Sequence, residues 1–146
     1  MVASTVRSQN IAPSSRLTLQ NRELAEETTV LRSLDWDRDR FDIEFGLRNG
    51  TTYNSFLIKG EKIALIDTSH RKFQELYLDS LTGLVDLSRL DYLIVSHTEP
   101  DHSGLVKEIL NLAPNVTVVG AKVAIQLDRK STRLNSSHSS VSRMPS

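Results

Sequence analysis

The sequence predicts an α/β fold in which a mixed β-sheet is covered by helices. Two observations lead to this prediction: apolar side chains alternate at two-residue spacing in the first half of the chain, and helical spacing replaces this pattern from about residue 73. After that change strands and helices alternate, as they do where a sheet continues with parallel strands. The chain has 146 residues, which is enough for one domain. Few helices are predicted, so we expect the architecture to be incomplete.

The first strands are predicted from alternation and turn signals. Residues 29–34 have a sequence typical of a strand, and residues 41–45 alternate apolar and polar side chains, as a half-buried strand does. A turn is expected at residues 48–50, which contain Asn and Gly. The apolar runs 55–58 and 63–66, separated by a short polar segment, predict a β-hairpin.

A helix is predicted where the spacing changes. Thr68 or Ser69 is a candidate N-cap, and Gly83 stands where the helix would stop. Five apolar side chains recur at helical spacing and are expected to face inward, namely Phe73, Leu76, Tyr77, Leu78 and Leu81.

The next segments alternate between strand and helix. Residues 90–95 are apolar apart from one acid, which predicts a buried strand. Residues 102–112 are expected to form a helix with Leu105, Ile109, Leu110 and Leu112 inward, closed by Pro114. Residues 116–119 predict a further strand, and residues 121–127 begin another helix.

Both ends of the chain differ from the segment 28–127, which we expect to be the structured domain. Residues 1–27 resemble a plastid transit peptide only faintly, so a disordered leader is favoured. Seven of the sixteen residues from 131 to 146 are serine, and residues 128–146 are expected to be disordered. Residues 129–140 resemble translated cloning-adapter sequence, which favours a non-native tail over a natural one. His138 is then not expected to bind a metal.

Composition excludes several classes of function. The chain has 18 basic and 18 acidic residues and a formal net charge of zero, so there is no electrostatic basis for nucleic acid or an anionic membrane as a partner. It has no cysteine, which excludes disulfides, zinc held by thiolates, iron–sulfur clusters and a cysteine nucleophile within this chain. No apolar run approaches the ~20 residues of a membrane span.

The candidate site is the run Ser-His-Thr-Glu-Pro-Asp-His-Ser-Gly at residues 96–104. It follows a predicted buried strand and precedes a helix, which is the usual place for a site in an α/β fold. Side chains of an extended segment alternate, so His97, Glu99 and Asp101 tend to point one way, while His102 adjoins Asp101. Nitrogen and carboxylate donors of this kind suit iron, manganese or zinc. Solvated side chains and a helix cap are the alternative, and the residues alone leave both open.

Three segments resemble the flavodiiron proteins, particularly the type found in cyanobacteria and photosynthetic eukaryotes. They are residues 34–41, residues 50–58 and the run 96–104, and the resemblance extends over residues 29–127, about two thirds of the chain. It implies the N-terminal half of a metallo-β-lactamase-like αββα sandwich. Related zinc hydrolases carry a second histidine where this chain has Glu99, and the glutamate biases the site toward iron.

The resemblance also implies a set of site residues and cofactors. His97 and Glu99 would bind one iron and Asp101 the other, with His102 beside the second iron. The remaining ligands, a histidine, a bridging aspartate and a further histidine, would lie beyond residue 127. A flavodoxin-like domain with FMN would follow as well.

The implied activity of the intact protein is reduction of dioxygen to water, or of nitric oxide, with electrons from NAD(P)H through FMN. The intact protein would form homo- or hetero-oligomers, with the cyanobacterial cytoplasm favoured over the chloroplast stroma. This chain alone is expected to be inactive. A zinc hydrolase of the same fold, or a fragment without a function of its own, are the alternatives.

Other residues carry weaker expectations. Asp67 ends the strand 63–66, where it would either accept a hydrogen bond from a metal-bound histidine or cap a helix, and both alternatives stay open. His70 is expected to be solvated. Trp36 and Tyr53 are expected to be packing residues.

Overall fold

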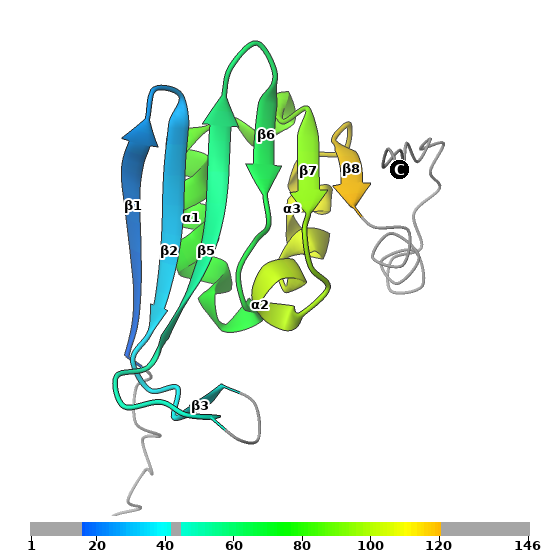
Figure 1. The fold of residues 1–146 in the computed structure, drawn as a ribbon. Helices are drawn as coiled ribbons and strands as arrows, with labels where there is room; N and C mark the ends of the chain where they lie inside the picture. The colour runs from blue at the N-terminus through cyan, green and yellow to red at the C-terminus, as the bar shows by residue number, and fades with distance from the viewer. Residues whose placement is uncertain (1–15, 42–44, 121–146) are drawn as a thin grey trace, which may run out of the picture.

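The computed structural model describes residues 16–41 and 45–120. Six strands form one sheet in the order β1-β2-β5-β6-β7-β8, and two short strands, β3 and β4, form a second one (Figure 1). The main sheet contains β1 (Leu17–Ala25), β2 (Thr28–Asp35), β5 (Thr51–Lys59), β6 (Ile63–Ile66), β7 (Tyr92–Val95) and β8 (Thr117–Gly120). Pairing is antiparallel from β1 to β6 and parallel from β6 to β8. The predicted α/β fold with a mixed sheet is confirmed.

The helices lie on one face of this sheet (Figure 1). They are α1 (Gln74–Leu84), α2 (Pro100–Ser103) and α3 (Val106–Leu112), with 3-10 turns η1 (Arg71–Phe73) and η2 (Leu87–Arg89). The core between helices and sheet is built from fully buried side chains of both layers, among them Leu31, Leu57, Leu65, Phe73, Tyr77, Leu81, Leu93 and Ile109. No helix in the described ranges is long and apolar enough to cross a membrane.

The opposite face of the sheet carries a row of apolar side chains, which we call the apolar row. Val30 pairs with Phe56, Phe56 with Ile66, Ile66 with Ile94, and Ile94 with Val119, so the row crosses five strands. These residues alternate with the core residues of their strands and do not belong to the core cluster, so they face away from the helices. Sheets with apolar side chains on both faces usually have other elements packed on both faces.

Strand β1 contradicts the prediction of a disordered leader for residues 17–25. This strand pairs with β2 along its whole length, from Leu17 opposite Asp35 to Ala25 opposite Thr28. Leu17 and Leu19 pack against the core, while the other side chains of the strand are exposed. Because β1 is an edge strand with one mostly polar surface, its apolar signal is weak in the sequence. Residues 1–15 lie outside the described part of the chain.

The strand predicted over residues 41–45 is also wrong. Arg40–Phe41 forms β3 and Phe45–Gly46 forms β4, and the two strands pair antiparallel with Phe41 opposite Phe45. Phe45 is 66% exposed, so the alternation of apolar and polar residues here does not reflect packing of one strand face on the core. Residues 42–44 are outside the described ranges, as are the helix predicted at 121–127 and the tail at 128–146.

Helix α1 starts later than predicted. Thr68 and Ser69 are fully buried and form hydrogen bonds with other segments, and the turn η1 before the helix is capped by the side chain of His70. The helix ends at Leu84, one residue past Gly83. Leu76 is 43% exposed, contrary to its predicted inward position, because the helix packs through Tyr77 and Leu81.

The helix predicted over residues 102–112 is two helices, α2 and α3, separated by Gly104 and Leu105. Leu105 and Ile109 are buried as expected, and Leu110 packs against the core. Leu112 is 46% exposed, so its predicted inward position is wrong. The break matters for the site, because it turns the end of the motif back toward strand β6.

The acid that interrupts the apolar run before β7 has a structural role. The carboxylate of Asp91 accepts hydrogen bonds from the backbone N–H of Ile63 at 2.8 Å and from Lys62 Nζ at 2.9 Å. These contacts, the backbone one first, lower the pKa of Asp91 below its ordinary value. Asp91 thereby ties the start of β6 to the start of β7.

We predict that Asp91→Asn reduces the pH dependence of stability in acid. The lowered pKa means that Asp91 contributes stability above its unfolded-state pKa of about 4, and that this contribution is lost as the pH falls through its folded-state pKa. Urea unfolding between pH 7 and pH 3 should therefore show a wild-type advantage that shrinks below pH 4. Asp79→Asn, at an exposed position of α1, is the control. A constant difference between wild type and Asp91→Asn at all pH values would contradict the prediction.

Candidate metal centre

The site is built at the ends of two neighbouring parallel strands. Strands β6 and β7 pair in parallel, with Ile66 opposite Ile94, so both end at the same edge of the sheet. Asp67 follows β6 directly, and Ser96 follows β7 and begins the motif. This edge is where ligands bind in open α/β sheets.

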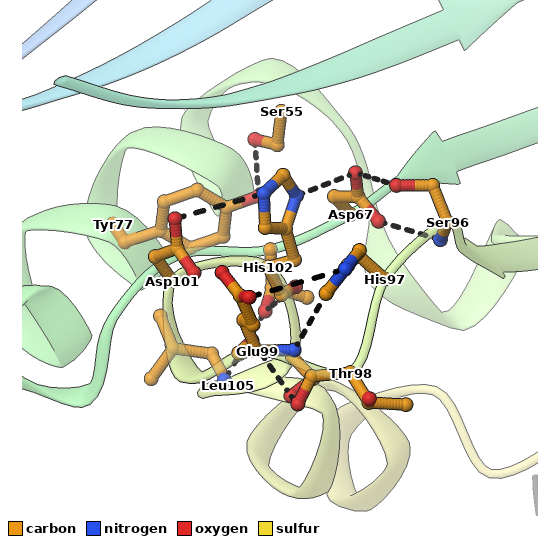
Figure 2. A network of polar contacts seen from close by, with 12 residues as sticks. Ser55, Asp67, Tyr77, Ser96, His97, Thr98, Glu99, Asp101, His102 and Leu105 are labelled. Carbon is orange, nitrogen blue, oxygen red and sulfur yellow. Dashed lines mark hydrogen bonds and ion pairs between the residues drawn. The ribbon is translucent and has the colours of Figure 1, made fainter. Parts of the chain in front are cut away.

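Asp67 holds both ends of the motif through its side chain. It is 6% exposed and has a φ of 57°, a left-handed conformation that Asp and Asn tolerate better than most residues. Its carboxylate accepts hydrogen bonds from the N–H of Ser96 at 2.8 Å, from Ser96 Oγ at 2.5 Å and from His102 Nδ1 at 3.0 Å (Figure 2). Of the two alternatives for Asp67, the structure supports the acceptor for a histidine, because no helix starts at this residue.

Thr68, the next residue, also contacts the motif, through its backbone and its hydroxyl. Its N–H and its Oγ1 both donate to the carbonyl oxygen of His102, at 2.7 and 2.8 Å. The same Oγ1 accepts from the N–H of Leu105 at 3.1 Å. The dipeptide after β6 therefore fixes His102 by its ring, through Asp67, and by its backbone, through Thr68.

His102 is oriented for binding through its other nitrogen. A carboxylate can only accept, so Nδ1 of His102 donates to Asp67 and the neutral ring keeps its lone pair on Nε2. That Nε2 lies 3.6 Å from Asp101 Oδ2. A carboxylate behind a histidine is the usual support for a histidine that ligates a metal.

The other two candidate ligands lie at the exposed side of the loop. His97 Nδ1 accepts the N–H of Glu99 at 3.1 Å, and His97 Nε2 lies 4.0 Å from Glu99 Oε1. Both side chains are more than half exposed. The rings of His97 and His102 are 5.6 Å apart, so the loop brings the four predicted residues together (Figure 2).

The donor set fits iron in its chemistry but is not assembled as a site. Two imidazoles and two carboxylates are the nitrogen and oxygen donors that iron, manganese and zinc accept. Within residues 16–41 and 45–120, no group of three or more His, Asp or Glu side chains is arranged to hold a metal ion. His97 also uses Nδ1 as an acceptor here, which places the proton of its neutral ring on Nε2. Ligation through Nε2 requires that proton to move.

Comparison with known proteins identifies the family. Residues 51–137 match the model of the family described as "ODP family beta lactamase", and this match includes the hairpin, α1 and the whole motif. The chain belongs to the ODP beta-lactamase family.

Curated relatives of this ODP-family chain are cyanobacterial flavoproteins. It is 73% identical over 126 residues to the putative diflavin flavoprotein A 1 of Nostoc sp., covering 86% of this chain and 22% of the relative. It is 66% identical over 116 residues to the diflavin flavoprotein A 1 of Synechocystis sp., covering 80% of this chain and 20% of the relative. The chain therefore spans about a fifth of the length of these relatives. It is homologous to their N-terminal metallo-β-lactamase-like domain.

Solved structures show the same fold. The metal-soaked flavodiiron core from Synechocystis sp. aligns with a TM-score of 0.71 and 39% identity, over 78% of this chain and 28% of that one. A fragment of the putative diflavin flavoprotein A 5 from Nostoc sp. aligns with a TM-score of 0.74 and 36% identity, over 88% of this chain and 52% of that one. The predicted resemblance to flavodiiron proteins, and the partial metallo-β-lactamase-like fold, are confirmed.

Sequence reasoning missed a second polar cluster of this ODP-family chain, next to the motif. Asp35 is 2% exposed and accepts hydrogen bonds from the hydroxyl of Tyr53, at 2.9 Å, and from Lys72 Nζ. His70 stacks on the Tyr53 ring and is half-buried, so the expectation that it is solvated is wrong. Tyr53 packs in the core, as expected, but also forms this polar contact. The available signal was the acid that directly follows the predicted strand 29–34.

Proposed function

We propose that this chain is the N-terminal part of the metal-binding domain of a flavodiiron oxidoreductase that reduces dioxygen to water, or nitric oxide. The observation that carries the proposal is the loop that brings His97, Glu99, Asp101 and His102 together, with His102 oriented by Asp67. The similarity of this chain to cyanobacterial diflavin flavoproteins and to a flavodiiron core supports it.

In this proposal each motif residue has its own task. His97 and Glu99 would hold one iron and Asp101 the other, and His102 would lie beside the second iron with its Nε2 free to bind it. Iron bound here would pass to the substrate the electrons that it receives from the donor. Asp67 keeps the proton of His102 on Nδ1 and so leaves Nε2 available. Thr68 fixes the backbone of His102, which limits movement of Asp101 next to it.

Electrons would come from NAD(P)H through FMN bound by a part of the protein outside this chain. The further iron ligands would also come from outside residues 1–127. We propose a cyanobacterial cytoplasmic protein that works as a homo- or hetero-oligomer, in line with its cyanobacterial relatives.

The test of the iron assignment is Glu99→Ala in the full-length protein that carries this segment. Removing an anionic ligand should weaken iron binding at least as much as the ~10- to 100-fold loss that follows removal of a supporting hydrogen bond. Metal analysis of the purified wild type and variant measures this, with Glu75→Ala, at an exposed position of α1, as the control. Equal iron in wild type and Glu99→Ala would contradict the assignment. Zinc in place of iron in the wild type would favour a hydrolase of the same fold.

A further inference from the structure

The second polar cluster is centred on a buried carboxylate. Asp35 ends β2 opposite Thr51 of β5, and this register places it within reach of Tyr53 and of Lys72 from η1. Lys72 keeps 30% of its side chain exposed, whereas Asp35 has 2%. A carboxylate so deeply buried is stable only with partners, so Asp35 holds the Tyr53 hydroxyl and the Lys72 ammonium in fixed positions.

His70 is held by the same residues. Its ring stacks on the Tyr53 ring, with centroids 5.9 Å apart and an interplanar angle of 27°. Its Nδ1 accepts the N–H of Lys72 at 3.3 Å. The neutral ring therefore carries its proton on Nε2, which is available as a hydrogen-bond donor.

His70 also lies against the motif. A Cβ atom added to Gly104 would be 2.6 Å from the carbonyl oxygen of Ser69 and 3.0 Å from the backbone nitrogen of Arg71, so the backbone on both sides of His70 touches the end of the motif. Asp101 lies on the side of His102 that faces away from Asp67 (Figure 2).

Electrostatics connect His70 and Tyr53 to Asp101. Burial is the main cause that raises the pKa of Tyr53 and lowers the pKa of His70, and the charges of Lys72 and Arg38 lower the latter further. The negative charge of the Asp101 carboxylate tends to raise both pKa values. Its charge is therefore within electrostatic reach of both side chains.

We propose that His70 forms the wall of the metal centre on the Asp101 side and donates its Nε2–H to a small ligand bound there. Asp35, Tyr53 and Lys72 are positioning residues that act through His70. This inference rests on the proposed function, because it requires a metal at the motif. It adds a binding residue and three supporting residues that the motif does not contain.

The experiment is an azide titration of the iron-loaded, full-length protein that carries this segment, followed by optical spectroscopy, with iron content measured for every variant. His70→Ala should weaken azide binding roughly 10- to 100-fold, the loss expected for one hydrogen bond to a charged ligand, while iron content stays at the wild-type level. His70→Gln should restore most of the affinity, because its amide offers an N–H donor. Tyr53→Phe keeps the stacked ring but removes the hydroxyl, and should weaken azide binding less than His70→Ala.

Matched controls and a double variant test whether the residues act together. Tyr92→Phe, at a Tyr that is 37% exposed, and Lys62→Met, which breaks the other lysine–aspartate pair, should leave azide binding unchanged. Tyr53→Phe combined with His70→Ala should bind azide no more weakly than His70→Ala alone, because Tyr53 acts through His70. Full iron content with unchanged azide affinity in His70→Ala, or additive losses in the double variant, would overturn the inference alone. A wild type without iron would overturn the proposed function as well.

Discussion

Replacing Gly104 with alanine is expected to disrupt the motif, because the backbone approaches this residue closely from two sides. The new Cβ atom would lie 2.4 Å from the carbonyl oxygen of Pro100 and 2.6 Å from that of Ser69, and neither can rotate away because both belong to the backbone. The φ of Gly104 is −61°, which alanine adopts readily, so the expected damage comes from the steric clash and not from backbone strain. Overpacking of this kind costs about 1–3 kcal/mol or more.

Gly83→Ala is the matched control for this prediction. A Cβ atom at Gly83 meets nothing within 4 Å, and the residue lies inside α1, so this substitution should be neutral or stabilising by about 0.5–1 kcal/mol. Equilibrium urea unfolding of the two variants gives both free energies. Equal midpoints for Gly104→Ala and Gly83→Ala would show that the close approach of Ser69 and Gly104 does not exist in solution.

Asp67→Ala is expected to have the second large effect, on stability and on metal binding together. It leaves three donors without their acceptor, two on Ser96 and one on His102, each costing about 1–3 kcal/mol if buried. Alanine also tolerates the φ of 57° less well than aspartate. We expect a loss of at least about 3 kcal/mol in the free energy of unfolding.

Asp67→Asn separates the two roles of this residue. Asparagine tolerates the backbone conformation and keeps one acceptor oxygen, so stability should fall by only about 1 kcal/mol. Its amide no longer requires His102 to carry the proton on Nδ1, and iron affinity should fall ~10- to 100-fold. Urea unfolding and iron titration of both variants measure these effects, with Asp79→Asn as the control. Wild-type iron affinity in Asp67→Asn would mean that Asp67 supports the fold alone.

The elements that the sequence predicted well are those whose signals are local. The hairpin of β5 and β6 follows from two apolar runs, and β7 and β8 from short apolar segments. Asp67 stood out because it directly follows a predicted strand, although its sequence context left a helix cap equally open. The motif 96–104 was found because four donor side chains lie within six residues.

The features that the sequence did not reveal depend on register and on contacts between distant segments. Strand β1 is specified by its pairing with β2, and little in its own polar sequence marks it. The cluster around Asp35 joins residues 18 and 37 positions apart, which no local pattern contains. Thr68 and Ser69 have the composition of a helix cap, but burial directs their hydroxyls to His102 and Ser33 instead.

The apolar row has a consequence for how the protein is made. Translation delivers the chain from its N-terminus at about 5–20 residues per second, so the sheet up to β8 emerges before any segment that follows it. The helices can cover one face of the nascent sheet at once, but Phe56, Ile66 and Ile94 stay partly exposed until another layer packs on them, whereas Val30 is already buried. During that interval these apolar side chains are accessible to a chaperone or to another nascent chain. We therefore expect the folding yield in the cell to depend on how quickly this second face is covered.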